Sequence, residues 1–136
     1  MPNVRGSGGR GLDFTLSNWR AWGTHDSEDV IAATDHVVAL GYADPDRLGI
    51  GGWSYGGTLT NDVITRTERF AGAVSGAGNA LWITNYGHDR YQDWYDTELG
   101  PPWESREIWE RVSPFNRVEN ITTPTLFIGE IGRAHV

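Results

Sequence analysis

The sequence contains no cysteine in 136 residues. This absence excludes a disulfide framework, a thiolate metal site and a cysteine nucleophile. Long apolar runs are missing as well, since one of the longest, residues 31–40, is interrupted by Thr, Asp and His. Because a membrane-spanning helix needs about 20 consecutive apolar residues, we expect no membrane segment in this chain.

Basic residues are scarce, with 11 Lys and Arg against 18 Asp and Glu, and the net charge is −7. Nucleic-acid affinity comes largely from clustered basic side chains that release counterions, so this balance disfavours a nucleic-acid partner. Glycine and tryptophan are abundant, at 18 and 7 residues, which indicates many tight turns and large apolar contact surfaces. The length fits one globular domain or part of one.

Hydrophobic periodicity predicts a helix over residues 27–40. Its apolar positions recur at helical spacing: Val30, Ala33, Val37 and Leu40. Asp26 and Asp29, three residues apart, resemble a capping box at its start, and Gly41 is placed to cap its end. The glycine-rich residues 5–11 before it are predicted to form a loop.

Short apolar runs alternate with helical segments along the rest of the chain. The predicted elements are strand 48–51, helix 58–65, strand 70–74, helix 104–112 and strand 125–128. In the helix at 104–112, Glu107 and Arg111 are spaced for an i,i+4 ion pair. This alternation predicts an α/β fold, with a mostly parallel sheet and helices on both faces.

A serine stands between the first of these strands and the helix that follows it. Gly52-Trp53-Ser54-Tyr55-Gly56 fits the G-x-S-x-G elbow, in which the serine occupies a strained strand-to-helix turn. We expect both glycines to be required because side chains there would crowd the neighbouring backbone. Ser54 is therefore the candidate nucleophile, and the backbone N–H of Tyr55 is the candidate oxyanion donor. Such a serine needs a histidine base and a carboxylate, which follow it as acid and then histidine.

Several segments together resemble the catalytic domain of the prolyl oligopeptidase family of serine peptidases, in its acylaminoacyl-peptidase and dipeptidyl-peptidase-like branch. They are N-V-R-G-S-G-G-R-G at 3–11, D-P-D-R at 44–47, G-W-S-Y-G-G at 52–57, Y-G at 86–87, E-L-G-P-P-W-E at 98–104, S-P at 113–114 and T-P-T-L at 123–126. The resemblance implies a partial α/β-hydrolase fold and hydrolysis of peptide or acyl-peptide bonds in short substrates. It implies no metal and no organic cofactor, and it leaves room for an upstream propeller domain.

The resemblance also implies a substrate pocket. Aromatic residues some tens of positions after the nucleophile line this pocket in the family, and Trp82 and Tyr86 match that placement. The alternative for both is packing beneath a loop. Beside the nucleophile, Tyr55 is expected to contact substrate and Trp53 to belong to the core.

The remaining triad residues do not match. The family's acid follows the strand at 125–128 in the pattern Gly-Glu-x-Asp, but Gly132 stands at the place of the aspartate. Residues 131–136 resemble the translation of a common sequencing adapter, and we interpret them as a non-native tail. Three histidines are assigned structural or solvent-facing roles: His25, His36 and His88.

We therefore expect residues 1–130 to be part of a peptidase domain that is truncated at both ends. Without the acid and the histidine, this piece alone is predicted to be inactive, because losing the histidine of such a triad costs on the order of 10⁶ in turnover.

Two other functions remain as alternatives. An esterase or lipase uses the same elbow, since the fold does not decide the substrate. A dinucleotide-binding module is suggested by residues 6–11, which formally fit G-x-G-x-x-G. No periodic helix is expected to open at that loop, and this weakens the second alternative.

Overall fold

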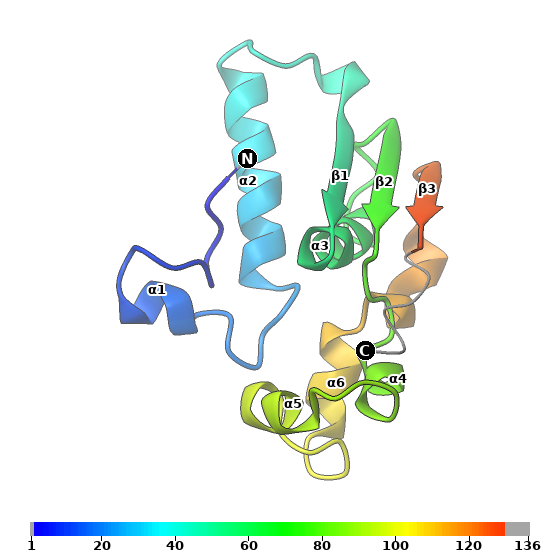
Figure 1. Ribbon diagram of the computed structural model, residues 1–136. Coiled ribbons are helices and arrows are strands. Elements are labelled where there is room, and N and C mark those ends of the chain that lie inside the picture. Colours follow the sequence, from blue (N-terminus) through cyan, green and yellow to red (C-terminus); the bar gives the residue numbers. More distant parts are fainter. Residues whose placement is uncertain (1, 130–136) are drawn as a thin grey trace.

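A parallel sheet of three short strands forms the centre of the fold in the computed structural model, which describes residues 2–129 (Figure 1). The strands run in the order β1 (Gly49–Trp53), β2 (Gly72–Gly76) and β3 (Thr125–Ile128). Gly51 pairs with Val74, and Val74 pairs with Leu126. The predicted parallel sheet is confirmed, and the strands predicted at 48–51, 70–74 and 125–128 are present, whereas the strand end expected at residues 2–4 is not.

Helices alternate with the strands along the chain. The helices are α1 (Leu12–Leu16), α2 (His25–Ala39), α3 (Tyr55–Ile64), α4 (Trp82–Tyr86), α5 (Gln92–Glu98) and α6 (Arg106–Val112), with short 3₁₀ turns at Pro45–Arg47 and Pro114–Asn120. The sequence predicted α2, α3 and α6. It missed α4 and α5, which are too short to show a helical period.

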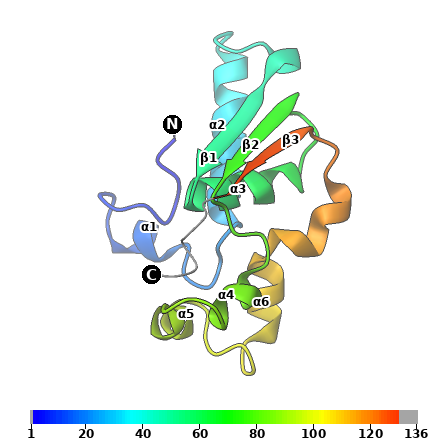
Figure 2. The same cartoon turned by 45° about the vertical axis from the view of Figure 1, so that its right-hand side comes forward.

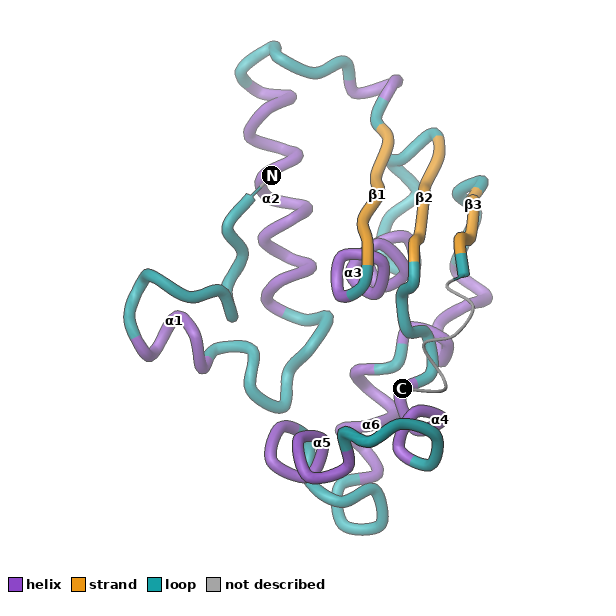
Figure 3. Tube along the Cα trace, in the orientation of Figure 1, coloured by secondary structure: helices purple, strands orange, loops and turns teal. Residues whose placement is uncertain are grey.

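The glycine-rich loop is followed by a short helix, too short to be the periodic helix whose absence was predicted. Gly11 is followed directly by α1, although α1 is only five residues long (Figure 3). The loop itself folds onto this helix, since the Gly6 N–H donates to the Phe14 carbonyl at 2.8 Å.

The end of α2 is capped as predicted. Gly41 has φ +73°, and its N–H donates to the Val38 carbonyl at 2.9 Å. The N–H of Tyr42 donates to the Val37 carbonyl at 3.0 Å. This pair of bonds is the Schellman arrangement, which requires a residue that tolerates a left-handed backbone.

The capping box predicted at the start of α2 was wrong. The residue before the helix is Thr24, whose side chain makes no capping bond. Asp29 instead accepts the backbone N–H of Arg5 at 2.7 Å and the Arg5 guanidinium at 3.0 Å. Asp26 keeps one oxygen on the first turn, where Oδ1 accepts the Ser27 N–H at 3.0 Å, and its other oxygen points into the protein.

The ion pair predicted on α6 was also wrong. Arg106 pairs with Glu110 at 2.7 Å, and Arg111 donates to the carbonyl of Arg20 at 2.7 Å. The apolar side of α6 faces the core, since Trp109 and Val112 are buried and Ile108 packs beside them.

Two apolar clusters contact α3, one through Val63 and the other through Tyr55. One joins α2 to the sheet through the buried residues Leu48, Val63 and Phe70. The other is an aromatic cluster built on α4, α5 and α6, with the buried members Trp22, Trp82, Tyr95, Leu99, Trp109 and Val112. Figure 1 shows the arrowheads of the strands pointing toward these three helices, so the carboxyl ends of the strands face the aromatic cluster.

The helices α2 and α3 lie on one side of the sheet (Figure 2). The opposite face presents Trp53 and Leu126, which are 55% and 59% exposed. The expectation that Trp53 belongs to the core was therefore wrong. Strand alternation puts Trp53 on the face away from α3, where its ring lies over Gly76. None of the helices within residues 2–129 is long and apolar enough to cross a membrane.

Candidate active site

Ser54 occupies the bend between β1 and α3. Its backbone has φ 58° and ψ −120°, a conformation that costs a non-glycine residue about 1–3 kcal/mol. The Ser54 N–H donates to the carbonyl of Gly76 at 2.9 Å, and the Ser54 carbonyl accepts the N–H of Thr58 at 3.1 Å. The predicted strand, sharp turn and helix are thus present, with β2 and α3 holding the strained residue on both sides.

Close backbone approach explains some of the motif glycines. A Cβ on Gly52 would lie far inside contact distance of the Gly56 backbone, and one on Gly57 would meet the carbonyl of Gly76. Gly78 packs equally tightly against Gly57. A Cβ on Gly56 would meet nothing within 4 Å, so the expectation that both glycines flanking Ser54 are sterically required was wrong for Gly56.

Tyr55 is the first residue of α3. The first N–H groups of a helix have no partner within the helix, so the Tyr55 amide is free of the helical ladder. The dipole of α3 adds partial positive charge at the same end. This end of α3 can therefore stabilise a negative charge that develops beside Ser54.

The side chain of Tyr55 is held by two residues that the sequence patterns did not associate with it. Its hydroxyl donates to Asp26 Oδ2 at 2.5 Å and accepts from Asn18 Nδ2 at 3.0 Å. Burial, followed by the charge of Asp26, raises the pKa of the Tyr55 phenol. No sequence spacing links residues 18, 26 and 55, so only the tertiary structure reveals this contact.

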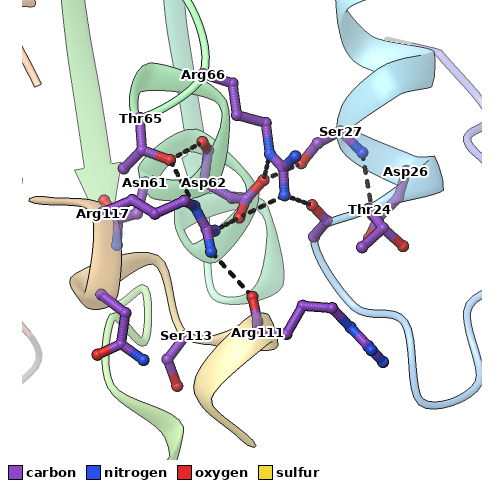
Figure 4. A network of polar contacts seen from close by, with 12 residues as sticks. Thr24, Asp26, Ser27, Asn61, Asp62, Thr65, Arg66, Arg111, Ser113 and Arg117 are labelled. Atoms are coloured by element: carbon purple, nitrogen blue, oxygen red, sulfur yellow. Dashed lines mark hydrogen bonds and ion pairs between the residues drawn. The ribbon is translucent and has the colours of Figure 1, made fainter. Parts of the chain in front are cut away.

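A second buried carboxylate, that of Asp62, anchors the helix that follows Ser54 (Figure 4). Asp62 on α3 is 1% exposed, and its Oδ2 accepts a hydrogen bond from Ser27 Oγ at 2.8 Å. It also pairs with the guanidinium groups of Arg66 and Arg117. These bonds tie α3 to α2 and to the segment before β3.

Trp82 and Tyr86 lie on α4, in the same aromatic cluster against which Tyr55 packs. Trp82 is 4% exposed, which favours the packing role that was the alternative for it. Tyr86 is only partly buried, and its hydroxyl donates to Asp96 Oδ1 at 3.0 Å. Burial raises the pKa of this phenol, and the hydrogen bond to Asp96 raises it further. The fold thus brings the three aromatic candidates to one cluster beside Ser54.

The histidines within residues 2–129 are not hydrogen-bonded to Ser54. His25 begins α2 and its Nδ1 lies 3.2 Å from Glu28 Oε2, while His36 is exposed on the same helix. No group of three or more His, Asp and Glu side chains in this described part could hold a metal ion. Glu130 and the tail at 131–136 lie outside the described residues.

Comparison with known proteins gives a family match and several relatives. Residues 1–129 match the Prolyl oligopeptidase family. An uncharacterized peptidase of Bacillus subtilis, YuxL, is 34% identical over 131 residues, which cover 93% of this chain and 20% of that protein.

Solved structures agree. The acylaminoacyl peptidase of Pyrococcus horikoshii superposes with a TM-score of 0.86 at 33% identity, over 93% of this chain and 21% of its own. An acylaminoacyl peptidase in complex with Z-Gly-Gly-Phe-chloromethyl ketone superposes with a TM-score of 0.83 at 32% identity, over the same shares. The chain spans about a fifth of the length of these proteins.

Proposed function

This chain belongs to the prolyl oligopeptidase family, and from that premise we propose that it carries the nucleophile of a serine peptidase. The substrates are short peptides or acyl-peptides, and Ser54 forms the acyl-enzyme. The backbone of Ser54, at φ 58° between β1 and α3, carries this proposal, because it presents a hydroxyl on a strained bend as the G-x-S-x-G elbow requires.

The chemistry proceeds in two steps. The Ser54 oxygen bonds to the carbonyl carbon, its proton passes to a histidine base, and that proton then reaches the leaving amine as the C–N bond breaks. A water molecule afterwards gives a proton to the same base and attacks the ester, and this second proton passes to the Ser54 oxygen as the ester bond breaks. We propose that residues 1–130 form part of this domain, and that base and acid come from elsewhere in the longer protein.

The N–H of Tyr55 donates to the oxyanion that forms in each step. Its place at the start of α3 supports this assignment. A second donor is needed in such a site, since oxyanion holes of this fold combine this amide with another N–H from an upstream loop.

Tyr86 and the ring of Tyr55 form the wall for the substrate residue before the scissile bond, and the buried Trp82 packs behind them. Their shared aromatic cluster supports this role. The related acylaminoacyl peptidase was solved with a ligand that ends in Phe, which favours an apolar or aromatic residue at that position. Because the Tyr86 hydroxyl is engaged by Asp96, Tyr86 offers its ring rather than a hydrogen bond.

An esterase with the same elbow is the second candidate, but the family match favours peptide substrates. A dipeptide anilide and a nitrophenyl ester, compared on the longer protein, separate the two. Preference for the anilide supports the peptidase, and turnover of the ester alone supports the esterase.

The nucleophile is tested by labelling the longer protein with a fluorophosphonate. We expect labelling and turnover in the natural protein and their loss in Ser54→Ala. Ser105→Ala is the matched control, because the Ser105 side chain makes no capping bond at α6. Undiminished labelling in Ser54→Ala contradicts the proposed function.

A further inference from the structure

Asp26 is a carboxylate with no exposure to solvent, at the start of α2. Burying such a group is costly unless its oxygens are hydrogen-bonded. Oδ1 accepts the N–H of Ser27 at 3.0 Å, and Oδ2 accepts Tyr55 Oη at 2.5 Å and Asn18 Nδ2 at 3.1 Å. Both oxygens of this buried carboxylate are therefore hydrogen-bonded.

These contacts form a closed triangle. Asn18 Nδ2 donates both to Asp26 and to the hydroxyl of Tyr55, which itself donates to Asp26. The triangle joins the segment after α1, the start of α2 and the start of α3. Tyr55 is thereby fixed at its hydroxyl end, while its ring packs on the aromatic cluster.

The fixed side chain belongs to the residue whose N–H stands next to Ser54. The peptide that carries this N–H is also held at its carbonyl, since the Ser54 C=O accepts the Thr58 N–H at 3.1 Å. A residue anchored at both ends has little freedom to rotate its peptide plane. Since an oxyanion donor works only when it is already aimed at the developing charge, this anchoring acts on reactivity.

We propose that Asp26 and Asn18 are positioning residues that hold the Tyr55 amide in the direction of the oxyanion. This inference rests on the proposed function of Ser54 and Tyr55, and it assigns to the triangle a role beyond stability. Both acylation and deacylation pass through an oxyanion, so both steps depend on the triangle.

Tyr55→Phe in the longer protein tests this directly, because it removes the hydroxyl and keeps the ring. We expect kcat to fall about tenfold with KM within about twofold. This loss is smaller than the roughly 10²–10³ that follows removal of a whole oxyanion donor. Burst and steady-state rates of an ester substrate should fall together.

An exchange of the two partners supplies the rescue. In Asp26→Asn alone, the Tyr55 hydroxyl has two amide partners and no carboxylate to accept its hydrogen bond. We expect kcat to fall about tenfold, as in Tyr55→Phe. The double variant Asp26→Asn with Asn18→Asp restores one carboxylate and one amide to the triangle. Recovery of kcat to within about threefold of the natural protein supports positioning, and no recovery contradicts it.

Tyr95→Phe is the matched control. Tyr95 is also buried and its hydroxyl donates to Asp89 at 2.7 Å, within α5 and the loop before it. We expect a comparable fall in Tm there with kcat unchanged. If Tyr55→Phe likewise lowers Tm and leaves kcat unchanged, the triangle is only structural and the inference fails.

Failure of the proposed function has a different signature. Turnover that survives Ser54→Ala removes the proposed function and the inference with it. Turnover that is lost in Ser54→Ala but unchanged in Tyr55→Phe leaves the proposed function standing and overturns the inference alone.

Discussion

At the scale of single residues, the bend at Ser54 is built from backbone contacts more than from side chains. Gly52 and Gly57 lie where the strand, the helix and the next strand touch. A strained residue persists only when its surroundings over-determine it, and these contacts do so here. The glycines at these two positions are therefore needed because neighbouring backbone segments approach closely there, and not because the chain must be flexible.

Gly56 and Gly57, at the start of α3, differ in how closely other backbone approaches them. We expect Gly57→Ala to destabilise the longer protein by about 2 kcal/mol or more, because its Cβ meets the carbonyl of Gly76. Gly56→Ala should be neutral or stabilise by up to about 1 kcal/mol, since the space is open and alanine favours a helix. Urea denaturation of both variants checks this, and equal losses would contradict it.

At the scale of elements, buried charges connect the helices. Asp62 joins α3 to α2 and to the segment before β3, and it is almost completely buried. Removing one partner of a buried ion pair leaves an uncompensated charge, which makes such a contact much more sensitive than a surface pair.

Asp62→Ala is expected to cost about 3–5 kcal/mol of unfolding free energy in the longer protein, because Arg66 and Arg117 are left without their carboxylate. The control is Asp35→Ala, because the Asp35 side chain is 61% exposed and loss of its pair with Arg69 should cost less than about 1 kcal/mol. Chemical denaturation measures both. A loss at Asp62 no larger than that at Asp35 would refute the anchoring role.

The loop at residues 5–11 is attached to α2 through Arg5. Hydrogen bonding to Arg5 lowers the pKa of Asp29, and contacts with His25 and then Arg5 lower the pKa of Glu28. A carboxylate whose pKa is lowered in the folded state stabilises the fold at pH values above its unfolded pKa of about 4. This stabilisation is lost as the pH falls through the folded pKa.

We therefore expect the loop to detach from α2 below about pH 4, where these carboxylates take up protons. Limited proteolysis of the longer protein with pepsin, over a range of acidic pH, should show earlier cleavage near Arg5 as the pH drops. In Asp29→Asn, cleavage should be faster already at the upper end of that range. Cleavage near Arg5 that is independent of pH and of Asp29 would contradict this attachment.

At the scale of the whole molecule, residues 2–129 leave one face of the sheet uncovered. Trp53, Val74 and Leu126 lie on this face, and all three are exposed. A contiguous apolar face on a sheet with an unpaired edge favours association. The same face is where further parts of a longer chain could pack.

The 136-residue chain expressed alone is predicted to self-associate and to lack peptidase turnover. Size-exclusion chromatography should show oligomers, and Leu126→Glu should shift the profile toward the monomer by placing a charge on the open face. A monomeric chain with a cooperative melt and normal turnover would contradict both parts of this prediction.

The sequence alone was sufficient for features that depend on near neighbours in the chain. The elbow at Ser54, the cap at Gly41 and β3 follow from local backbone requirements and short apolar runs. The family, too, was recognisable from motifs a few residues long. These features are encoded by residues that act on their own stretch of backbone.

Tertiary structure alone decided which distant side chains meet. Asp26 lies 29 residues from Tyr55, and Asp62 lies 55 residues from Arg117. Sequence patterns assigned Asp26 to a helix cap and Trp53 to the core, because spacing describes one element at a time. The direction in which a side chain points depends on the element packed against it, and that is determined only when the chain folds.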